Sequence, residues 1–215
     1  MTDITNPLIE EYIASHSSEE SPLLQQITRE TYSEVLMPRM ISGHFQGRVL
    51  SMLSFMIRPK RILEIGAFTG YSALCLAEGL TEGGELITLD INEELEDRVR
   101  SYIDKAGMSE KITYLIGDAV TLIPSLEGMF DLVFIDADKH NYLQYYHLVF
   151  DKIAEGGVIM VDNTLWNGKV CQPELVAKDK DTRNLDSFNK YILQDTRVEK
   201  VILPVRDGIT IIRKK

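Results

Sequence analysis

The chain has 215 residues, of which 44% are hydrophobic and 26% charged, and its formal net charge is −10. This composition is typical of a globular domain. The negative charge argues against nucleic acid or an anionic membrane as the main partner, because both repel an acidic surface. No apolar run approaches the roughly 20 residues that span a bilayer, no secretory signal is evident, and only two cysteines are present. We therefore expect a cytoplasmic protein with reduced thiols.

Residues 1–58 are predicted to be helical. The pair Ser21-Pro22 suits the N-cap and first turn of one helix, and a second helix is predicted to start after Ser42 and to stop at Pro59. Apolar residues recur on one face of the second helix, and this face is predicted to pack into the core. They are Phe45, Val49, Met52, Leu53 and Met56. We expect residues 1–58 to act as a lid or dimer arm packed on residues 59–215, within one structural domain.

Short apolar runs alternate with helical segments from residue 61 onward. This alternation predicts right-handed βαβ crossovers and a mostly parallel sheet. Two final runs flank Arg206-Asp-Gly208, which is a hairpin signal. We expect an α/β, doubly wound sheet of seven strands with an antiparallel last strand. The predicted strands are Arg61–Gly66, Glu85–Asp90, Lys111–Asp118, Phe130–Asp136, Gly157–Asn163, Val198–Val205 and Ile209–Arg213. The predicted helices are Tyr71–Leu80, Asn92–Ala106, a short one broken at Pro124, and Asn141–Ala154.

One long segment fits neither pattern. The polar stretch Thr164–Arg183 shows little periodicity, so it is predicted to be a loop. Loops of this length inside a compact domain are usually functional or mobile.

The turn after the first predicted strand stands where a nucleotide-binding loop belongs. It reads Glu64-Ile-Gly-Ala-Phe-Thr-Gly70, so a glutamate replaces the first glycine of the dinucleotide fingerprint. Gly66 permits close approach of a ligand, and Asp90 ends the next strand, where an acid commonly accepts ribose hydroxyls. This combination indicates a nucleoside ligand without a pyrophosphate, such as S-adenosylmethionine. The alternative is a plain tight turn with Asp90 as a helix cap; Asp118 likewise either borders an adenine or caps a helix.

Polar side chains also follow the fourth and fifth predicted strands. Asp136, Asp162 and Asn163, here called the oxygen trio, lie at the sheet edge where open α/β sheets bind ligands. Two carboxylates and an amide carbonyl are hard donors that suit Mg²⁺ or Ca²⁺. Lys139 follows Asp136 closely and is placed to act as a base toward a hydroxyl held there. The alternative is that the acids cap helices and Lys139 is a solvated surface lysine.

Four motifs resemble the cation-dependent O-methyltransferases. They are Leu63-Glu-Ile-Gly-Ala-Phe-Thr-Gly-Tyr-Ser72, Phe134-Ile-Asp-Ala-Asp-Lys139 with Tyr142, Val161-Asp-Asn-Thr-Leu-Trp-Asn-Gly168 and Leu203-Pro-Val-Arg-Asp-Gly-Ile-Thr210. That family includes caffeoyl-CoA O-methyltransferase, bacterial relatives and, more distantly, catechol O-methyltransferase. The resemblance implies a Rossmann-like methyltransferase fold, usually a homodimer. It also implies direct methyl transfer from S-adenosylmethionine to a vicinal-diol phenol, with Mg²⁺ or alternatively Ca²⁺ or Mn²⁺.

The resemblance further implies roles for individual residues. Lys139 corresponds to the general base, and Asp136, Asp162 and Asn163 correspond to the metal ligands, of which Asp136 also serves catalysis. The residues that would contact S-adenosylmethionine are Met40, Ser42, Glu64, Gly66, Ser72, Asp90, Ala119, Asp136 and Asp138. The substrate-side residues are Trp166 and Asn167.

The acceptor and several rival functions stay open. A CoA thioester, a small catechol, a flavonoid-like phenol and a hydroxylated cofactor precursor are all acceptor candidates, because Cys171–Arg183 departs from the plant enzymes. An NAD(P)-binding oxidoreductase would need a glycine in place of Glu64 and gives the oxygen trio no role. A binding module without catalysis would be favoured by loss of the trio or Lys139, yet all four are present. A metal-independent methyltransferase of nucleic acid or protein is disfavoured by the acidic composition.

Overall fold

The structure, a computed structural model, describes residues 7–215. The strands are β1 (Arg61–Ile65), β2 (Glu85–Asp90), β3 (Ile112–Ile116), β4 (Phe130–Ile135), β5 (Ile153–Val161), β6 (Val198–Leu203) and β7 (Ile209–Lys214). The α-helices are α1 (Pro7–Ser15), α2 (Pro22–Glu34), α3 (Gly43–Ile57), α4 (Tyr71–Ala77), α5 (Glu96–Lys105), α6 (Ala119–Ser125), α7 (Tyr142–Phe150), α8 (Pro173–Lys178) and α9 (Lys180–Gln194). The 3-10 helices are η1 (Pro38–Met40), η2 (Glu93–Leu95), η3 (Lys139–Asn141) and η4 (Trp166–Cys171).

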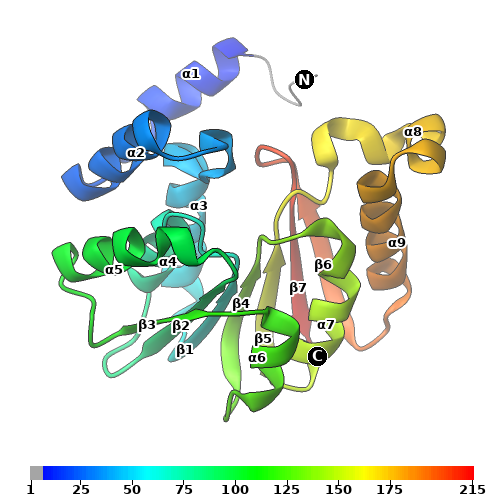
Figure 1. Ribbon diagram of the computed structural model, residues 1–215. Coiled ribbons are helices and arrows are strands. Elements are labelled where there is room, and N and C mark those ends of the chain that lie inside the picture. Colours follow the sequence, from blue (N-terminus) through cyan, green and yellow to red (C-terminus); the bar gives the residue numbers. More distant parts are fainter. Residues whose placement is uncertain (1–6) are drawn as a thin grey trace.

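A single twisted sheet carries helices on both faces (Figure 1). Its strands lie in the order β3-β2-β1-β4-β5-β7-β6 across the described part of the chain. The pairings β1–β2, β1–β4, β2–β3 and β4–β5 are parallel, whereas β7 runs antiparallel to both β5 and β6. The predicted doubly wound α/β sheet with an antiparallel last strand is therefore confirmed. No helix within residues 7–215 is long and apolar enough to cross a membrane.

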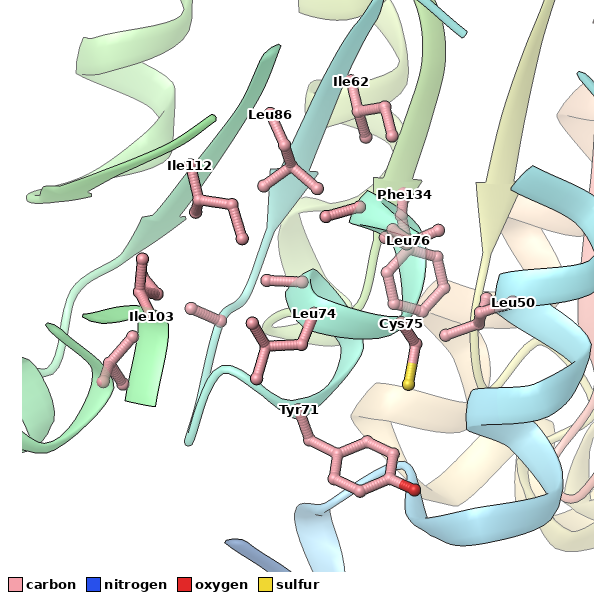
Figure 2. Close-up of a cluster of buried hydrophobic side chains, with 14 of the residues drawn as sticks. Leu50, Ile62, Tyr71, Leu74, Cys75, Leu76, Leu86, Ile103, Ile112 and Phe134 are labelled. Carbon is pink, nitrogen blue, oxygen red and sulfur yellow. The ribbon is translucent and has the colours of Figure 1, made fainter. Parts of the chain in front are cut away.

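Two hydrophobic clusters cover the two faces of the sheet. One lies between the sheet and helices α2 to α5, where Leu50 of α3, Ile62 of β1 and Phe134 of β4 are fully buried (Figure 2). The other lies under α6, α7 and α9 and includes Phe188. Strands β1 and β4 are buried on both faces along most of their length, which explains why their sequences are mostly apolar rather than alternating.

Helices α2 and α3 share the first of these clusters with the sheet. Helix α2 begins as predicted, because the Leu24 N–H donates to Ser21 Oγ at 3.3 Å and proline occupies the first turn. Leu24 and Ile27 then pack into the same cluster as β1. The division into residues 1–58 and 59–215 stays a prediction, and residues 1–6 lie outside the described residues.

The predicted buried face of α3 is only partly right: Leu53 packs half-buried against the first cluster, whereas the two methionines of that face do not pack into the core. Met52 and Met56 are 60% and 73% exposed, and the neighbouring Phe55 is exposed as well. The buried positions are instead Gln46, Gly47, Leu50, Ser51 and Ser54. Close packing against α4 explains this choice, since a Cβ on Gly47 would lie only 2.6 Å from the Tyr71 ring. Small residues let the two helices approach, so the more apolar face is turned outward.

The predicted loop over Thr164–Arg183 is also wrong. The segment holds η4, α8 and the start of α9. Left-handed Asn167 and Gly168 interrupt η4, which removes helical periodicity from its sequence. The buried side chains of α9 are Thr182, Leu185, Phe188 and Ile192. Its apolar stripe therefore lies almost entirely beyond Arg183, where the predicted loop ends.

Strand β5 begins at Ile153 rather than at Gly157. Helix α7 accordingly ends at Phe150, and Ala154 belongs to the strand and not to the predicted helix. The pairing with β4 shifts register between Phe130 and Leu132, and Gly156 is left-handed. This irregularity separates the first residues of β5 from its main apolar run. The sequence pattern therefore assigned them to the end of the preceding helix.

Gly66 permits the close approach of β1 to the end of β4. Its φ is +100°, and a Cβ there would lie 2.0 Å from the carbonyl oxygen of Asp136. Such a separation is far below contact distance, and the atom met is backbone, so no side-chain rotation relieves it. Glycine is therefore required at this position both by backbone conformation and by space.

The substitution Gly66→Ala should lower the free energy of unfolding by about 3 kcal/mol or more, because it adds a backbone clash to left-handed strain. Urea denaturation followed by circular dichroism measures the loss. Gly83→Ala is the matched control, since Gly83 is also left-handed but a Cβ there meets nothing within 4 Å. The control should lose only about 1–2 kcal/mol. Equal losses in the two variants would contradict the close-approach explanation.

Candidate active site

The predicted site residues gather at the carboxyl edge of the parallel strands. From β1 to β5 this edge carries Glu64, Gly66, Asp90, Asp136, Asp138, Lys139, Asp162 and Asn163, with Ser72 in α4 and Ala119 at the start of α6. Met40 and Ser42 approach from η1 and the start of α3, and Trp166 and Asn167 lie in η4. The structure therefore brings elements from most of the chain to one edge of the sheet.

Glu64 is a fully buried acid at the end of β1. Thr88 Oγ1 donates a hydrogen bond of 2.5 Å to its Oε2, whereas Oε1 is buried without a hydrogen bond of normal geometry. The pKa of Glu64 is raised to about 7, mainly by burial and also by the Asp136 and Asp90 carboxylates, while the Ser72 and Thr88 hydroxyls oppose the shift. An unpaired oxygen beside the turn fits a ligand that presents N–H or O–H groups, as S-adenosylmethionine does.

Asp90 fixes the turn that follows β1. Its Oδ2 accepts the Phe68 N–H at 2.7 Å, and its Oδ1 accepts the Asn92 N–H at 2.9 Å. Phe68 is left-handed, with φ of 46°. A second contact reaches the same turn from α2, where Thr31 Oγ1 donates to Thr69 Oγ1 at 3.2 Å. The carboxylate and the N-terminal helix together hold this turn in place.

Two other predicted acids already have protein partners. Asp118 caps α6, because its Oδ1 accepts the Val120 N–H at 2.9 Å. Asp138 accepts the Tyr145 hydroxyl at 2.5 Å and lies 3.1 Å from His140 Nδ1. Asp118 therefore follows the helix-cap alternative, and Asp138 is held at the start of η3 by an aromatic hydroxyl.

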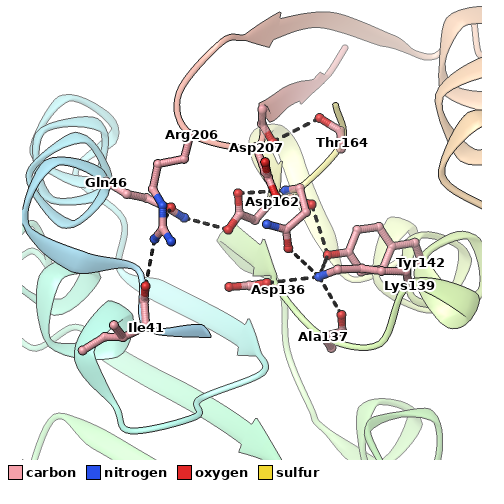
Figure 3. Close-up of polar contacts among 12 residues, drawn as sticks. Ile41, Gln46, Asp136, Ala137, Lys139, Tyr142, Asp162, Thr164, Arg206 and Asp207 are labelled. Carbon is pink, nitrogen blue, oxygen red and sulfur yellow. Dashed lines mark hydrogen bonds and ion pairs between the residues drawn. The ribbon is translucent and has the colours of Figure 1, made fainter. Parts of the chain in front are cut away.

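The Lys139 ammonium lies among the oxygen trio (Figure 3). Its Nζ is 3.3 Å from Asp136 Oδ1 and 2.5 Å from Asn163 Oδ1. It also contacts the Tyr142 hydroxyl at 2.7 Å and the Ala137 carbonyl at 2.9 Å. The lysine side chain is only 12% exposed, so the surface-lysine alternative does not describe it.

Asp162 is the most buried member of the trio. Its Oδ2 accepts from Gln46 Nε2 at 2.8 Å, and its Oδ1 accepts the Asn163 N–H at 2.8 Å. The pKa of Asp162 is raised to about 7, mainly by burial and also by the nearby Asp136 carboxylate, while the hydrogen bonds from Gln46 and Asn163 and the charge of Lys139 oppose the shift. Two neighbouring carboxylates that resist joint ionisation fit a divalent cation, which would neutralise both.

The donor chemistry of the trio fits a hard cation. Its third donor is an amide, Asn163, and within residues 7–215 no group of three or more His, Cys, Asp or Glu residues is arranged to hold a metal. Oxygen donors of this kind suit Mg²⁺, Ca²⁺ or Mn²⁺ and not a thiolate-bound metal.

The turn between β6 and β7 holds the predicted substrate side. The Asp207 carbonyl accepts the Leu165 N–H at 2.8 Å and the Trp166 N–H at 3.2 Å, and its carboxylate accepts the Asn167 N–H at 3.2 Å. A Cβ on Gly208 would lie 2.5 Å from Leu165 Cγ. The Trp166 ring centroid is 5.9 Å from Lys139 Nζ. Trp166 therefore borders the trio, whereas Asn167 is tied to Asp207.

A family model described as O-methyltransferase matches residues 14–215. The chain belongs to the O-methyltransferase family. Caffeoyl-CoA O-methyltransferase 1 from Eucalyptus globulus is 40% identical over 178 residues, which cover 79% of this chain and 72% of that relative. An SAH-bound methyltransferase from Podospora anserina is 29% identical, with a TM-score of 0.89 over 97% of this chain and 94% of its own. An O-methyltransferase from Bacillus cereus in complex with SAH is 27% identical, with a TM-score of 0.89 over 97% of both chains.

The predicted enzyme class, an O-methyltransferase, is confirmed by these matches. They leave the oxidoreductase and binding-module alternatives without support. The SAH-bound structures support the prediction of S-adenosylmethionine as the cofactor.

Sequence reasoning missed three residues that orient the site of this O-methyltransferase. Gln46 was overlooked because the wrong face of α3 was expected to be buried. The hairpin signal at Arg206-Asp-Gly208 was recognised, but Arg206 and Asp207 were given no contacts. No local sequence pattern pointed to the contacts of these residues, because their partners are distant in the chain.

The buried Glu64 makes the stability of the O-methyltransferase depend on pH in a defined direction. Because its pKa rises from 4.5 to about 7 on folding, its stabilising contribution is fully present below pH 4.5 and is lost as the pH rises through 7. Relative to Glu64→Gln, which stays neutral, the wild type should lose about 2 kcal/mol of unfolding free energy between about pH 5.5 and 8. Urea denaturation without cofactor at both pH values measures this difference. A difference between the two proteins that does not change with pH would contradict the burial of a protonated acid.

Proposed function

We propose that this O-methyltransferase transfers the methyl group of S-adenosylmethionine to one hydroxyl of a vicinal-diol phenol, using a divalent cation at the oxygen trio. The observation that carries the proposal is the contact of Lys139 Nζ with Asp136 and Asn163 at the ends of neighbouring strands. A base beside hard oxygen donors is the arrangement that deprotonates a chelating diol. The caffeoyl-CoA O-methyltransferases among its relatives support a phenolic acceptor.

The cofactor is proposed to lie along the ends of β1 and β2. S-adenosylmethionine supplies an electrophilic sulfonium methyl group. The unpaired buried Oε1 of Glu64 and the close backbone approach at Gly66 support this position. The residues proposed to contact it are Met40, Ser42, Glu64, Gly66, Ser72, Asp90, Ala119, Asp136 and Asp138.

The cation is proposed to be Mg²⁺, with Ca²⁺ or Mn²⁺ as alternatives, held by Asp136, Asp162 and Asn163. A bound divalent cation supplies Lewis acidity, which lowers the pKa of a phenol hydroxyl. The protein's own part is to keep two carboxylates and an amide oxygen fixed at one sheet edge, so that little reorganisation is needed.

Lys139 is proposed to act as the general base. As the neutral amine, its Nζ takes the proton of the acceptor hydroxyl, whose oxygen forms the new O–CH₃ bond as the S–CH₃ bond breaks in line and S-adenosylhomocysteine leaves. The Tyr142 hydroxyl and the Ala137 carbonyl hold the lysine in this position. Trp166 is proposed to flank the aromatic ring of the acceptor, and Asn167 to line the same side. Positioning of this kind accounts for most of the acceleration in a direct transfer.

We also expect a homodimer. The outward face of α3 exposes Met52, Phe55 and Met56, an apolar cluster that suits an interface between two copies. Light scattering of the purified protein measures its mass directly, and a monomer would end this expectation.

Activity should depend on the oxygen trio and on a divalent cation. Transfer of labelled methyl from S-adenosylmethionine to caffeic acid, its CoA ester, simple catechols and quercetin should proceed with Mg²⁺ and stop with EDTA. Asp136→Ala should lose at least about 100-fold in kcat/KM. Asp131→Ala is the control on the same strand, because Asp131 binds the Lys60 and Arg61 N–H groups at the opposite edge of the sheet. Wild-type activity in Asp136→Ala, unaffected by EDTA, would end the proposal.

Replacing Lys139 should slow the methyl-transfer step without weakening the binding of the cofactor. Lys139→Met should lower kcat by about 100-fold or more, the usual contribution of a positioned base. The affinity for S-adenosylhomocysteine, measured by calorimetry, should stay within about twofold, because Lys139 contacts the trio and not the turn after β1. An unchanged kcat would rule out Lys139 as the base.

A further inference from the structure

Three side chains from distant parts of the chain form a continuous hydrogen-bonded row that ends on the oxygen trio. Arg206 Nη1 donates to Gln46 Oε1 at 3.1 Å, and Gln46 Nε2 donates to Asp162 Oδ2 at 2.8 Å (Figure 3). They lie on the β6–β7 turn, on α3 and at the end of β5. We call this row the Arg206–Gln46–Asp162 relay.

The chemistry of the row allows only one orientation of the central amide. A guanidinium has donors and no acceptor, so it faces the amide oxygen and never the amide nitrogen. The nitrogen of Gln46 must then face Asp162, which as a carboxylate only accepts. Without Arg206, the amide oxygen is buried without a donor and the side chain loses one of its two anchors. Arg206 and Asp162 therefore select the same orientation of the Gln46 amide, and Arg206 holds it from the far end.

Gln46 has no other evident function in the fold. It is 1% exposed on a helix face otherwise made of small or apolar residues, where an unpaired amide would be costly. Its amide oxygen accepts a hydrogen bond from Arg206, and its amide nitrogen donates one to Asp162. If Gln46 served packing alone, an apolar residue of the same shape would fill its position without loss of stability.

Arg206 is held in place independently of Gln46. Its Nη1 also donates to the Ile41 carbonyl at 2.8 Å and to the Ser42 carbonyl. Its backbone is left-handed, with φ of 48°, which is uncommon for a residue with a side chain. The turn therefore keeps an unfavourable backbone conformation while the guanidinium sits against the start of α3.

We infer that Gln46 and Arg206 are positioning residues that set the Asp162 carboxylate for cation binding. The inference rests on the proposed function, because it takes Asp162 as a ligand. Two hydrogen bonds fix the carboxylate, one on each oxygen, and a carboxylate retains further lone pairs for a cation. Partners that orient a ligand in this way typically change metal affinity by about 10–100-fold.

Mn²⁺ binding measured by electron paramagnetic resonance tests the inference without any turnover. Gln46→Met keeps the shape of the side chain and removes its donor, and should weaken Mn²⁺ binding by about 10–100-fold. Arg206→Met should weaken it in the same direction, and Arg206→Lys, which keeps a charged donor, should recover part of the loss. The affinity of Gln46→Met for S-adenosylhomocysteine should match the wild type, which shows that the sheet and the cofactor turn are intact. The Arg206 variants also lose the contacts with the Ile41 and Ser42 carbonyls, so their folding is checked by circular dichroism instead.

A double-mutant cycle shows whether Arg206 acts through Gln46. The double variant Gln46→Met/Arg206→Met should bind Mn²⁺ no more weakly than Gln46→Met alone, because the arginine then has no amide to orient. Arg98→Met is the control: it removes the ion pairs of α5 with Glu30 and Glu34 of α2 but touches no member of the relay. Its Mn²⁺ affinity should equal that of the wild type.

Three results would overturn the inference. If Gln46→Met binds Mn²⁺ as tightly as the wild type, Gln46 does not position Asp162. If the losses in the double variant are additive, Arg206 does not act through Gln46. A loss in Arg98→Met as large as in Arg206→Met assigns the effect to loosening of the N-terminal helices. A wild type that binds S-adenosylhomocysteine but no Mn²⁺ is a distinct outcome. It would contradict the metal site of the proposed function, and the inference about Gln46 and Arg206 would fail with it.

Discussion

Burial of negative charge at one edge of the sheet is the constraint on which the site depends. Glu64 and Asp162 are both buried at strand ends, and Asp136 lies between them at the end of β4. An uncompensated buried carboxylate destabilises a fold by several kcal/mol, so each acid requires donors or a cation. Gln46 and Lys139 supply them for the trio. Much of the polar structure around the edge follows from this need, and the same negative charge supports the proposed binding of a cation and a sulfonium there.

Buried parallel strands and their polar ends were predictable from the sequence for a physical reason. A strand covered on both faces must be apolar throughout, so any acid at its end stands out, as in Phe130–Asp136. The topology then places all such ends at one edge. The boundaries of β5 were less predictable, because a register shift and left-handed Gly156 break the run that signals a strand.

The packing of α3 was not predictable from periodicity. Hydrophobic spacing selects the more apolar face as the buried one, whereas the helix buries the face that allows the closest approach to α4. Gly47 illustrates the difference, because it has no side chain to bury and a Cβ at its position would lie only 2.6 Å from the Tyr71 ring. The contacts of Gln46, Arg206 and Asp207 were hidden for a related reason, since partners so distant in sequence leave no local pattern.

The two halves of the site differ in how far along the chain their contacts reach. The turn after β1, which is proposed to bind the cofactor, is fixed by contacts of shorter range: Phe68 and Asp90 are 22 positions apart, and Thr31 and Thr69 are 38 apart. Arg206 binds Ile41 across 165 positions, and Gln46 binds Asp162 across 116. Closing such long loops costs more chain entropy. The proposed cation site therefore depends on the docking of both ends of the described chain on the sheet, more than the turn after β1 does.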